Sequence, residues 1–237
     1  MRSIKQLINE RYHEAKAVFW GGSVSQKIGT KHSDLDLVII FENRPHAYRE
    51  AFFYDNWPID AFIHDLQTLK YFCKEIEAVD GRPALINMIL NGQEVLNQDN
   101  IGNKAKDIAR SAFNEGPNVW NKEIIDKERF LITDIFQDIQ FSKNIDEQRI
   151  SAVHLFEPLL QFYFRAQNKW AASGKSLMRL LQQNNPELAL ELNNSFDVLF
   201  KTGQATELEL VITRILQPYG GFLWNGFKSN APIHWKL

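Results

Sequence analysis

The stretch FWGGSVSQKIGTKHSDLDLVIIFE, residues 19–42, decides the fold of this chain. A short apolar run ends at two glycines, and the next apolar run begins with Asp34-Leu35-Asp36. Because alternate side chains of a strand point to the same face, Asp34 and Asp36 are predicted to project side by side. Two carboxylates that close repel each other unless a cation lies between them. The stretch therefore predicts a strand whose first residues, Asp34 and Asp36, bind a positively charged group.

The turn before that strand has the composition of a phosphate-binding loop. Glycine at position 22 lets the backbone approach an anion closely, and Ser23 adds a hydroxyl. The residues that follow can open a short helix whose free N–H groups face an anion. Carboxylates beside a phosphate suit Mg²⁺, which is usually held by one or two carboxylates together with substrate phosphates.

A third acid, Asp60, stands in the middle of a run that reads as a strand, WPIDAFIH. Aspartate is unfavourable inside a strand, so this one needs a reason. If its strand neighbours residues 35–42, Asp60 completes a three-carboxylate site, which can hold two metal ions. Asp65 is interpreted as the N-cap of the next helix rather than as a ligand, and His64 as a residue outside the site.

The chain changes character near residue 116, at NEGPN. Periodicity predicts helices over 3–16, 66–78, 82–91 and 101–113, and strands over 17–20, 35–42, 93–97 and on both sides of a turn at Asp55-Asn56. The helix over 66–78 is predicted to bury Leu66, Leu69, Phe72, Cys73 and Ile76. Helices alone are predicted beyond the change, near 121–142, 146–170, 174–183, 186–201 and 204–216. The fold class is therefore α+β, with a mixed α/β domain at 1–116 and a helical bundle at 117–237.

The composition of the 237 residues limits the partners of the protein. The formal net charge is −2, so no basic excess points to nucleic acid, which is an unlikely partner. A single cysteine, Cys73, allows no disulfide within the chain and favours a reducing compartment. No apolar stretch is long enough for a membrane span, and no signal-peptide core is present. We expect a cytoplasmic protein without a membrane partner.

At these motifs the sequence resembles the nucleotidyltransferase superfamily, which has the polymerase-beta-like fold. The family pattern is Gly followed by Gly or Ser, a spacer, Asp-x-Asp, and a further acid on a later strand. In this chain the pattern reads Gly22-Ser23, Asp34-Leu35-Asp36 and Asp60, with Ser33 before the first aspartate. The resemblance covers roughly residues 17–97. It is closest to stand-alone bacterial members, either minimal nucleotidyltransferase domains or antibiotic nucleotidyltransferases with an added helical domain.

One departure from the family pattern concerns the phosphate loop. Many members carry Arg-Gly shortly after the serine, whereas this chain has Gln26-Lys27 and a later glycine at Gly29. The loop is therefore expected to follow a different path, with Lys27 or Lys31 supplying the cation. The residues expected to bind nucleotide are Gly22, Ser23, Lys27 and Ser33.

The resemblance implies a magnesium-dependent nucleotidyltransferase. Asp34, Asp36 and Asp60 would be the catalytic and metal-binding residues of a two-ion site. A nucleoside monophosphate, most simply AMP from ATP, would pass to a hydroxyl with release of pyrophosphate. The acceptor would be a small molecule such as an aminoglycoside-like antibiotic. The alternatives are a protein acceptor, as in toxin-neutralising adenylylation, and a non-catalytic nucleotide-binding or sensor module. The oligomeric state stays open.

The helical half carries weaker signals. The tetrapeptide SGKS at 173–176 is interpreted as a helix start, because Lys169 stands where a P-loop needs glycine and a helix rather than a strand precedes it. The acids of the long helices are interpreted as a solvated face, although one of them is an alternative to Asp60 as general base. These acids are Glu123, Asp126, Glu128, Asp134, Asp138 and Glu157.

Overall fold

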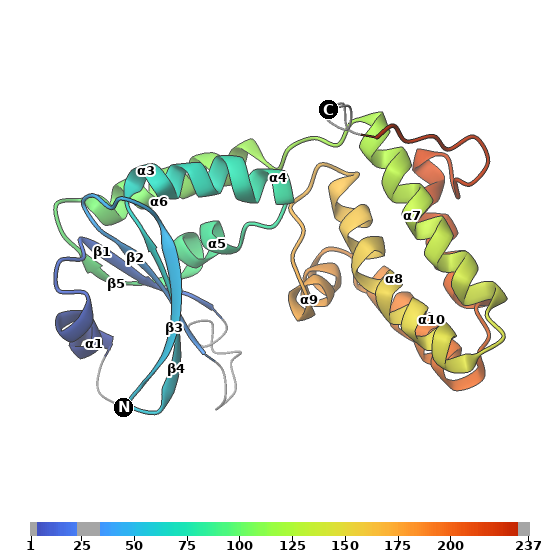
Figure 1. Cartoon of the computed structure of the whole chain (residues 1–237), viewed down its shortest axis with the longest axis horizontal. Coiled ribbons are helices and arrows are strands. Elements are labelled where there is room, and N and C mark those ends of the chain that lie inside the picture. The colour runs from blue at the N-terminus through green and yellow to red at the C-terminus, as the bar shows by residue number, and fades with distance from the viewer. Residues whose placement is uncertain (1–3, 23–33, 232–237) are drawn as a thin grey trace. The chain divides into compact units, whose positions relative to one another are not determined.

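The computed structural model describes residues 4–22 and 34–231 of the chain (Figure 1). The chain divides into two compact units, Met1–Asn118 and Val119–Leu237. The first unit contains a sheet and helices, and the second is built from helices in the part that the structure describes. The chain is therefore α+β, as the sequence predicts. None of the described helices combines the length and apolarity that a membrane crossing needs.

A mixed five-stranded sheet forms the centre of the first unit (Figure 1). Its strands are β1 (Ala17–Trp20), β2 (Leu35–Ile40), β3 (Tyr48–Tyr54), β4 (Trp57–His64) and β5 (Gln93–Asn97). Their order is β3-β4-β2-β1-β5. The β2–β4 pair is parallel, and the other pairs are antiparallel. Every predicted strand is present, so the local patterns were sufficient to find them.

A two-residue turn at Asp55-Asn56 fixes the register of the β3–β4 hairpin. Both residues have left-handed backbones, with φ values of 51° and 65°. Aspartate and asparagine tolerate this conformation better than most residues, and such turns match the twist of the flanking strands. Tyr54 consequently pairs with Trp57, and Ala51 pairs with Asp60.

Helices cover both faces of the sheet. They are α1 (Ile4–Arg11), α3 (Leu66–Tyr71), the π-helical η1 (Phe72–Glu77), α4 (Ala78–Asp80), α5 (Ala84–Asn91) and α6 (Ile101–Glu115). The odd-numbered side chains of β2, from Leu35 to Ile39, are buried with Leu7 and Ile8 of α1 in one core. Helices α5 and α6 contact β1, and α5 also contacts β2. Asp34 and Asp36 belong to the even-numbered set, which faces away from the α1 core.

Two helix predictions in this unit were wrong in detail. The helix predicted over 3–16 ends at Arg11. The helix predicted over 66–78 becomes π-helical at Phe72, and its wider turn changes which side chains point inward. Phe72 and Ile76 are 37% and 41% exposed, whereas Leu69 and Cys73 are fully buried.

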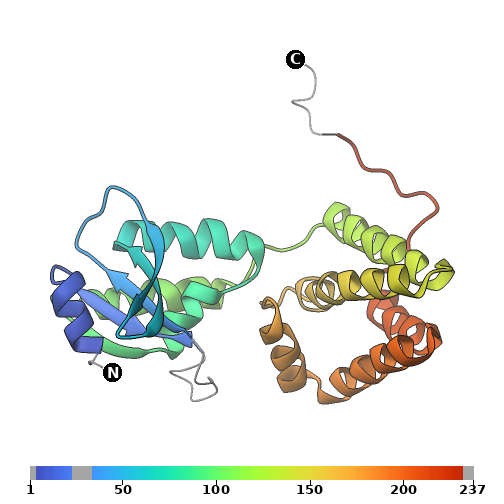
Figure 2. The same ribbon diagram turned by 60° about the horizontal axis from the view of Figure 1, so that its bottom comes forward.

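The second unit packs its helices around a separate apolar core (Figure 2). They are α7 (Lys122–Phe141), α8 (Ile145–Arg165), α9 (Lys175–Asn184), α10 (Pro186–Thr202), α11 (Thr206–Leu216) and the short 3-10 helix η2 (Gln217–Tyr219). Helices α7 and α8 lie side by side in both views (Figures 1 and 2). The predicted end of α8 at residue 170 was wrong, because Asn168 has φ 57° and an α-helix cannot pass through it.

Candidate functional site

The structure brings the three predicted carboxylates together. Each of Asp34, Asp36 and Asp60 offers an oxygen, and these oxygens all lie within 4.8 Å of one another. The parallel register of β2 and β4 places Asp36 directly beside Asp60, and Asp34 stands just before β2 on the same side. Asp60 is only 6% exposed, Asp36 is partly buried and Asp34 is exposed. The cluster therefore opens from a buried carboxylate outward to solvent.

The glycine pair after β1 is explained by its contacts with this cluster. Gly22 has φ 74°, and a Cβ there would collide with Asp36 Oδ2 and lie 2.7 Å from its Cγ. A Cβ at Gly21 would lie 2.6 Å from Cγ of Met88 on α5, and the Gly21 N–H donates to the Asp36 carbonyl at 2.9 Å. Only glycine allows the backbone to pass this close to the carboxylate in this conformation.

Arg49 is the charged neighbour of the cluster that the sequence analysis missed. Its Nε donates to Asp60 Oδ1 at 2.8 Å, and its Nη2 donates to Oδ2 at 2.6 Å. The guanidinium also lies over the ring of Phe62, 4.9 Å from its centroid. Hydrogen bonding to Asp60 raises the pKa of Arg49 above its ordinary value, and the charges of Asp36 and Asp34 act in the same direction.

The pairing of Arg49 with Asp60 could have been found by counting from the hairpin turn. A two-residue turn at Asp55-Asn56 sets Ala51 opposite Asp60 and Arg49 opposite Phe62. Arg49 is then the diagonal neighbour of Asp60 on the same face of the sheet, within reach of a long side chain. The arginine side chain is 65% exposed, whereas the carboxylate it binds is 8% exposed. One end of the pair is therefore accessible to a ligand.

His64 and Asp65 lie outside the cluster, as the sequence analysis predicts. His64 is four residues along β4 from Asp60, and its ring packs edge-on against Phe72 with a centroid distance of 4.9 Å. Burial lowers the pKa of His64 to about 4. Asp65 forms a capping box with Thr68 at the start of α3, so its predicted role as a helix cap is confirmed. Burial acts to raise the pKa of Asp65, but the N–H groups of Thr68 and Arg44 outweigh it and lower the pKa.

The remaining predicted nucleotide-binding residues, Ser23, Lys27 and Ser33, lie outside the described residues, and so do Gly29 and Lys31. Of the predicted phosphate loop, the structure therefore describes Gly22 at its start. Gly22, the last described residue before them, lies against the Asp36 carboxylate.

The donor set of the cluster is made of oxygens alone. Three carboxylates from two adjacent strands and the preceding loop carry more negative charge than Arg49 balances. Hard divalent cations prefer such ligands, and thiol or imidazole ligands are absent from this group. The residues present therefore fit a divalent cation, with one exposed edge left for a further ligand.

Comparison with known proteins finds similarity to solved structures only. No protein-family model matches the chain, and no curated protein is significantly similar to it. The chain is similar to a nucleotidyltransferase-like protein from Exiguobacterium sibiricum, with 12% sequence identity and a TM-score of 0.49. The match covers 91% of this chain and 75% of that one. At this level the likeness says nothing about chemistry, which must come from the residues themselves.

Proposed function

We propose that the protein is a magnesium-dependent nucleotidyltransferase that moves AMP from ATP to a hydroxyl of a small molecule. The observation that supports this proposal is the convergence of Asp34, Asp36 and Asp60 within 4.8 Å. Their position beside Gly22, where the predicted phosphate loop begins, supports a substrate with both a metal and phosphates. Aminoglycoside-like antibiotics are the proposed acceptors, and the cytoplasm is the proposed location.

In this reaction the acceptor oxygen forms a bond to the α-phosphorus of the nucleotide. The bond between that phosphorus and the bridging oxygen breaks, and pyrophosphate leaves with the electron pair. Asp34, Asp36 and Asp60 would hold Mg²⁺, which supplies charge neutralisation for the triphosphate and the leaving group. The backbone at Gly22 would lie along the phosphates together with Ser23. Rate acceleration then comes from orientation and electrostatics.

The hydrogen bonds of Arg49 constrain the choice of general base. Both oxygens of Asp60 accept from Arg49, which leaves one lone pair on each oxygen for a metal ion or for the acceptor proton. Release of one oxygen by Arg49 would give the acceptor hydroxyl more room at Asp60. Because the guanidinium is mostly exposed, Arg49 can exchange this partner for a phosphate oxygen at modest cost.

The proposal is tested by following pyrophosphate release from each of the four NTPs with Mg²⁺, with and without an aminoglycoside panel. Release with ATP that requires an aminoglycoside is the expected result. Label transfer from ATP to a protein would instead support the protein-acceptor alternative. Tight nucleotide binding without turnover under any condition would support the sensor alternative and contradict the proposal.

A matched pair of variants compares a carboxylate of the cluster with a carboxylate elsewhere on the surface. Asp36→Asn removes one carboxylate of the cluster, whereas Asp107→Asn makes the same chemical change on the exposed surface of α6. Asp36→Asn is expected to lower turnover at least about 100-fold, which is the usual scale for the loss of one transition-state charge partner. Asp107→Asn should leave turnover unchanged. Equal turnover in the two variants would exclude the carboxylate cluster as the site.

A further inference from the structure

The hairpin strand β3 presents alternate side chains on the same face of the sheet as the carboxylate cluster. Ala51 pairs with Asp60, and Arg49, two residues before Ala51, binds the Asp60 carboxylate on that face. Phe53 follows Ala51 at the same spacing, so its side chain projects from this face as well. Arg49, Ala51 and Phe53 are all exposed, and together they are referred to as the hairpin shelf.

Phe53 takes no part in the core beneath the hairpin. Its neighbours Phe52 and Tyr54 project from the opposite face and pack against the core that contains α1. Phe53 itself is 78% exposed and belongs to neither apolar core of the described residues. Diagonal neighbours on adjacent antiparallel strands lie roughly 7–8 Å apart, which an aromatic side chain can span. Phe53 therefore offers an open ring face beside Asp60.

The carboxylates lie in a row that runs across the sheet from the end of β1 to β3. Gly21, directly after β1, donates its N–H to the Asp36 carbonyl. Asp36 on β2 pairs with Asp60 on β4, which in turn pairs with Ala51 on β3. The row thus begins where the backbone at Gly22 passes the Asp36 carboxylate, and it ends at the hairpin shelf.

The direction of this row places the acceptor, given the proposed function on which this step rests. In the proposed transfer the phosphates lie along the backbone at Gly22, at the first end of the row. The attacking and the leaving oxygens lie roughly in line on either side of the transferred phosphorus. Pyrophosphate then leaves toward Gly22, so the acceptor hydroxyl comes from the other end of the row, which is the hairpin shelf.

We propose that Phe53 binds the acceptor and that the acceptor is a ring-bearing alcohol, such as an amino sugar of an aminoglycoside. The ring packs flat against the exposed face of Phe53, which removes apolar C–H groups of both partners from water. An ammonium substituent of the ring is attracted by the same aromatic face. The small side chain of Ala51 leaves room for the hydroxyl to reach Asp60. An open-chain alcohol has no flat face for this contact, so the shelf favours cyclic acceptors.

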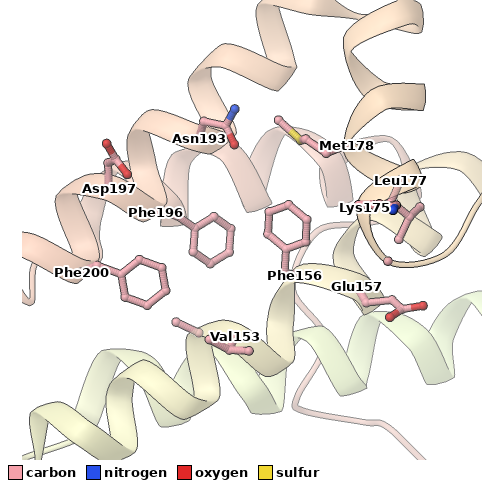
Figure 3. A pocket seen from close by; sticks show the side chains of 12 residues that line it. Val153, Phe156, Glu157, Lys175, Leu177, Met178, Asn193, Phe196, Asp197 and Phe200 are labelled. Carbon is pink, nitrogen blue, oxygen red and sulfur yellow. The ribbon is translucent and has the colours of Figure 1, made fainter. Parts of the chain in front are cut away.

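The second unit contains a competing place for a ring-bearing molecule, which is a cavity of about 570 Å³ between α8, α9 and α10 (Figure 3). Figure 3 shows Phe156 and Phe196 facing each other, and their ring centroids are 5.3 Å apart. Asp197 at the rim is paired with Lys201 at 3.0 Å. The cavity shares no residue with the hairpin shelf or with the carboxylate cluster, so variants can separate the two places.

Kanamycin A and spermine test the role of Phe53 on the full chain, in the presence of Mg²⁺ and the non-hydrolysable α,β-methylene-ATP. Both probes carry several ammonium groups, but spermine is an open chain without rings. In Phe53→Ala the affinity for kanamycin A should fall at least about fivefold, the scale of one exposed contact with an aromatic face. The affinities for spermine and for the nucleotide should stay unchanged. Phe53→Tyr keeps the ring face and should bind kanamycin A as the native chain does. Titration calorimetry measures these affinities.

Two control variants locate the binding. Phe141→Ala removes a ring of similar exposure, 72%, from α7, and Phe156→Leu removes a ring from the wall of the cavity. Neither change should alter the affinity for kanamycin A. Equal affinities in the native chain and in Phe53→Ala, an equal loss for spermine, or no measurable binding of kanamycin A would overturn the proposal. A loss in Phe156→Leu alone would place the binding in the cavity and would overturn it as well.

Pyrophosphate release separates this proposal from the proposed function. With an aminoglycoside that supports turnover, Phe53→Ala should raise the KM for the aminoglycoside about fivefold and leave the KM for ATP unchanged. Release with the same KM in both chains would retain nucleotidyl transfer and overturn the role of Phe53. Weaker kanamycin A binding in Phe53→Ala, without release under any condition, would support ring binding at Phe53 and contradict nucleotidyl transfer.

Discussion

The interior of the first unit contains carboxylates, whereas the interior of the second contains guanidinium groups. Among the described residues, Asp60, Asp65 and Glu77 are buried in the first unit. Arg129 and Arg165 are the charged residues buried in the second. Carboxylates can take up a proton near neutral pH when burial raises their pKa, but arginine stays charged under all usual conditions. The two units should therefore respond differently to pH and to cations.

Two of these buried charges, Glu77 and Arg129, have partners that explain their positions. Glu77 accepts from the N–H groups of Leu85 and Ile86 at the start of α5. Arg129 donates at 2.8 Å both to the Gly221 carbonyl and to Asp126 Oδ1, which ties the chain beyond η2 to α7. The arginine bonds hold one backbone segment against another. The carboxylates of the first unit instead either cap a helix or converge on one point.

The largest expected effect comes from Asp60→Asn. Loss of this carboxylate removes the buried ligand of the cluster, so nucleotidyl transfer should fall at least about 100-fold. Stability should change little by comparison, because the partner Arg49 is mostly exposed. Asp55→Asn, the same change at the hairpin turn, is the control and should keep full turnover, since asparagine tolerates the left-handed backbone there. Turnover is measured as pyrophosphate release, and similar rates in both variants would contradict the role of Asp60.

The second effect is on the pH dependence of stability. Burial raises the pKa of Glu77 to about 7, although the N–H groups of Leu85 and Ile86 act to lower it and Asp80 acts to raise it. In the unfolded chain the pKa of a glutamate is about 4.3. The protonated side chain therefore contributes its full stabilisation below about pH 4.3. This stabilisation is lost as the pH rises from there to about 7. Relative to Glu77→Gln, the native chain should lose no more than about 3 kcal/mol of unfolding free energy between pH 5 and pH 8.

Urea unfolding at several pH values measures this difference, and Arg129→Gln is its counterpart in the second unit. The cost of Arg129→Gln should be the same at pH 5 and pH 8, because arginine side chains do not titrate in this range. A pH-independent difference for Glu77→Gln would show that Glu77 is already ionised in the folded protein. The contrast between the two interiors would then fail.

The third prediction separates two consequences of a side chain at position 22, which are collision with the Asp36 carboxylate and strain of the left-handed backbone. Gly22→Ala introduces a Cβ that collides with the Asp36 carboxylate. Gly203→Ala places a Cβ at a similar φ of 76° in the left-handed region, with its nearest atoms at 3.4 Å or more, so it carries the strain without a collision. Both variants should lose about 1–2 kcal/mol from the left-handed backbone. Only Gly22→Ala should weaken the binding of Mg²⁺ or Mn²⁺, by about tenfold, as measured by calorimetry. Equal metal affinities would mean that the contact with Asp36 is unimportant.

The smallest effect has the opposite sign. Arg49→Gln removes a cation that competes for Asp60, so divalent-ion affinity should rise about threefold. Without metal the variant should lose about 1 kcal/mol of stability, because a buried carboxylate loses its partner. Arg11→Gln is the control. It breaks the exposed ion pair between Arg11 of α1 and Glu50, which lies on the same strand as Arg49, and it should leave metal affinity unchanged. Weaker metal binding in Arg49→Gln would contradict competition between Arg49 and the metal.

Much of the first unit follows from local sequence patterns. The strands of the sheet are visible as apolar runs bounded by turn residues, and Asp65 is recognisable as a helix cap from its position alone. The exposed positions of Phe72 and Ile76 are not visible in this way. The π-helical turn that moves them has no local signal as clear as proline or glycine.

In the second unit the helices follow from the sequence, but the cavity does not. Phe156 and Phe196 occur in apolar helical patterns that are typical of a core. Whether such rings meet other side chains or line an open space depends on how α8, α9 and α10 cross. Crossing geometry is a property of the assembled helices and of all their side chains together.

The sequence by itself determined which carboxylates are the candidates for a metal site, because an aspartate pair at the start of a strand and a lone aspartate inside another are costly unless they bind something. Only the tertiary structure decided that they meet. The parallel register of β2 and β4 sets Asp36 beside Asp60, and the hairpin brings Arg49 to the same carboxylate. Register between strands distant in sequence depends on the packing of both sheet faces, and a shift by one residue would turn Asp60 to the opposite face.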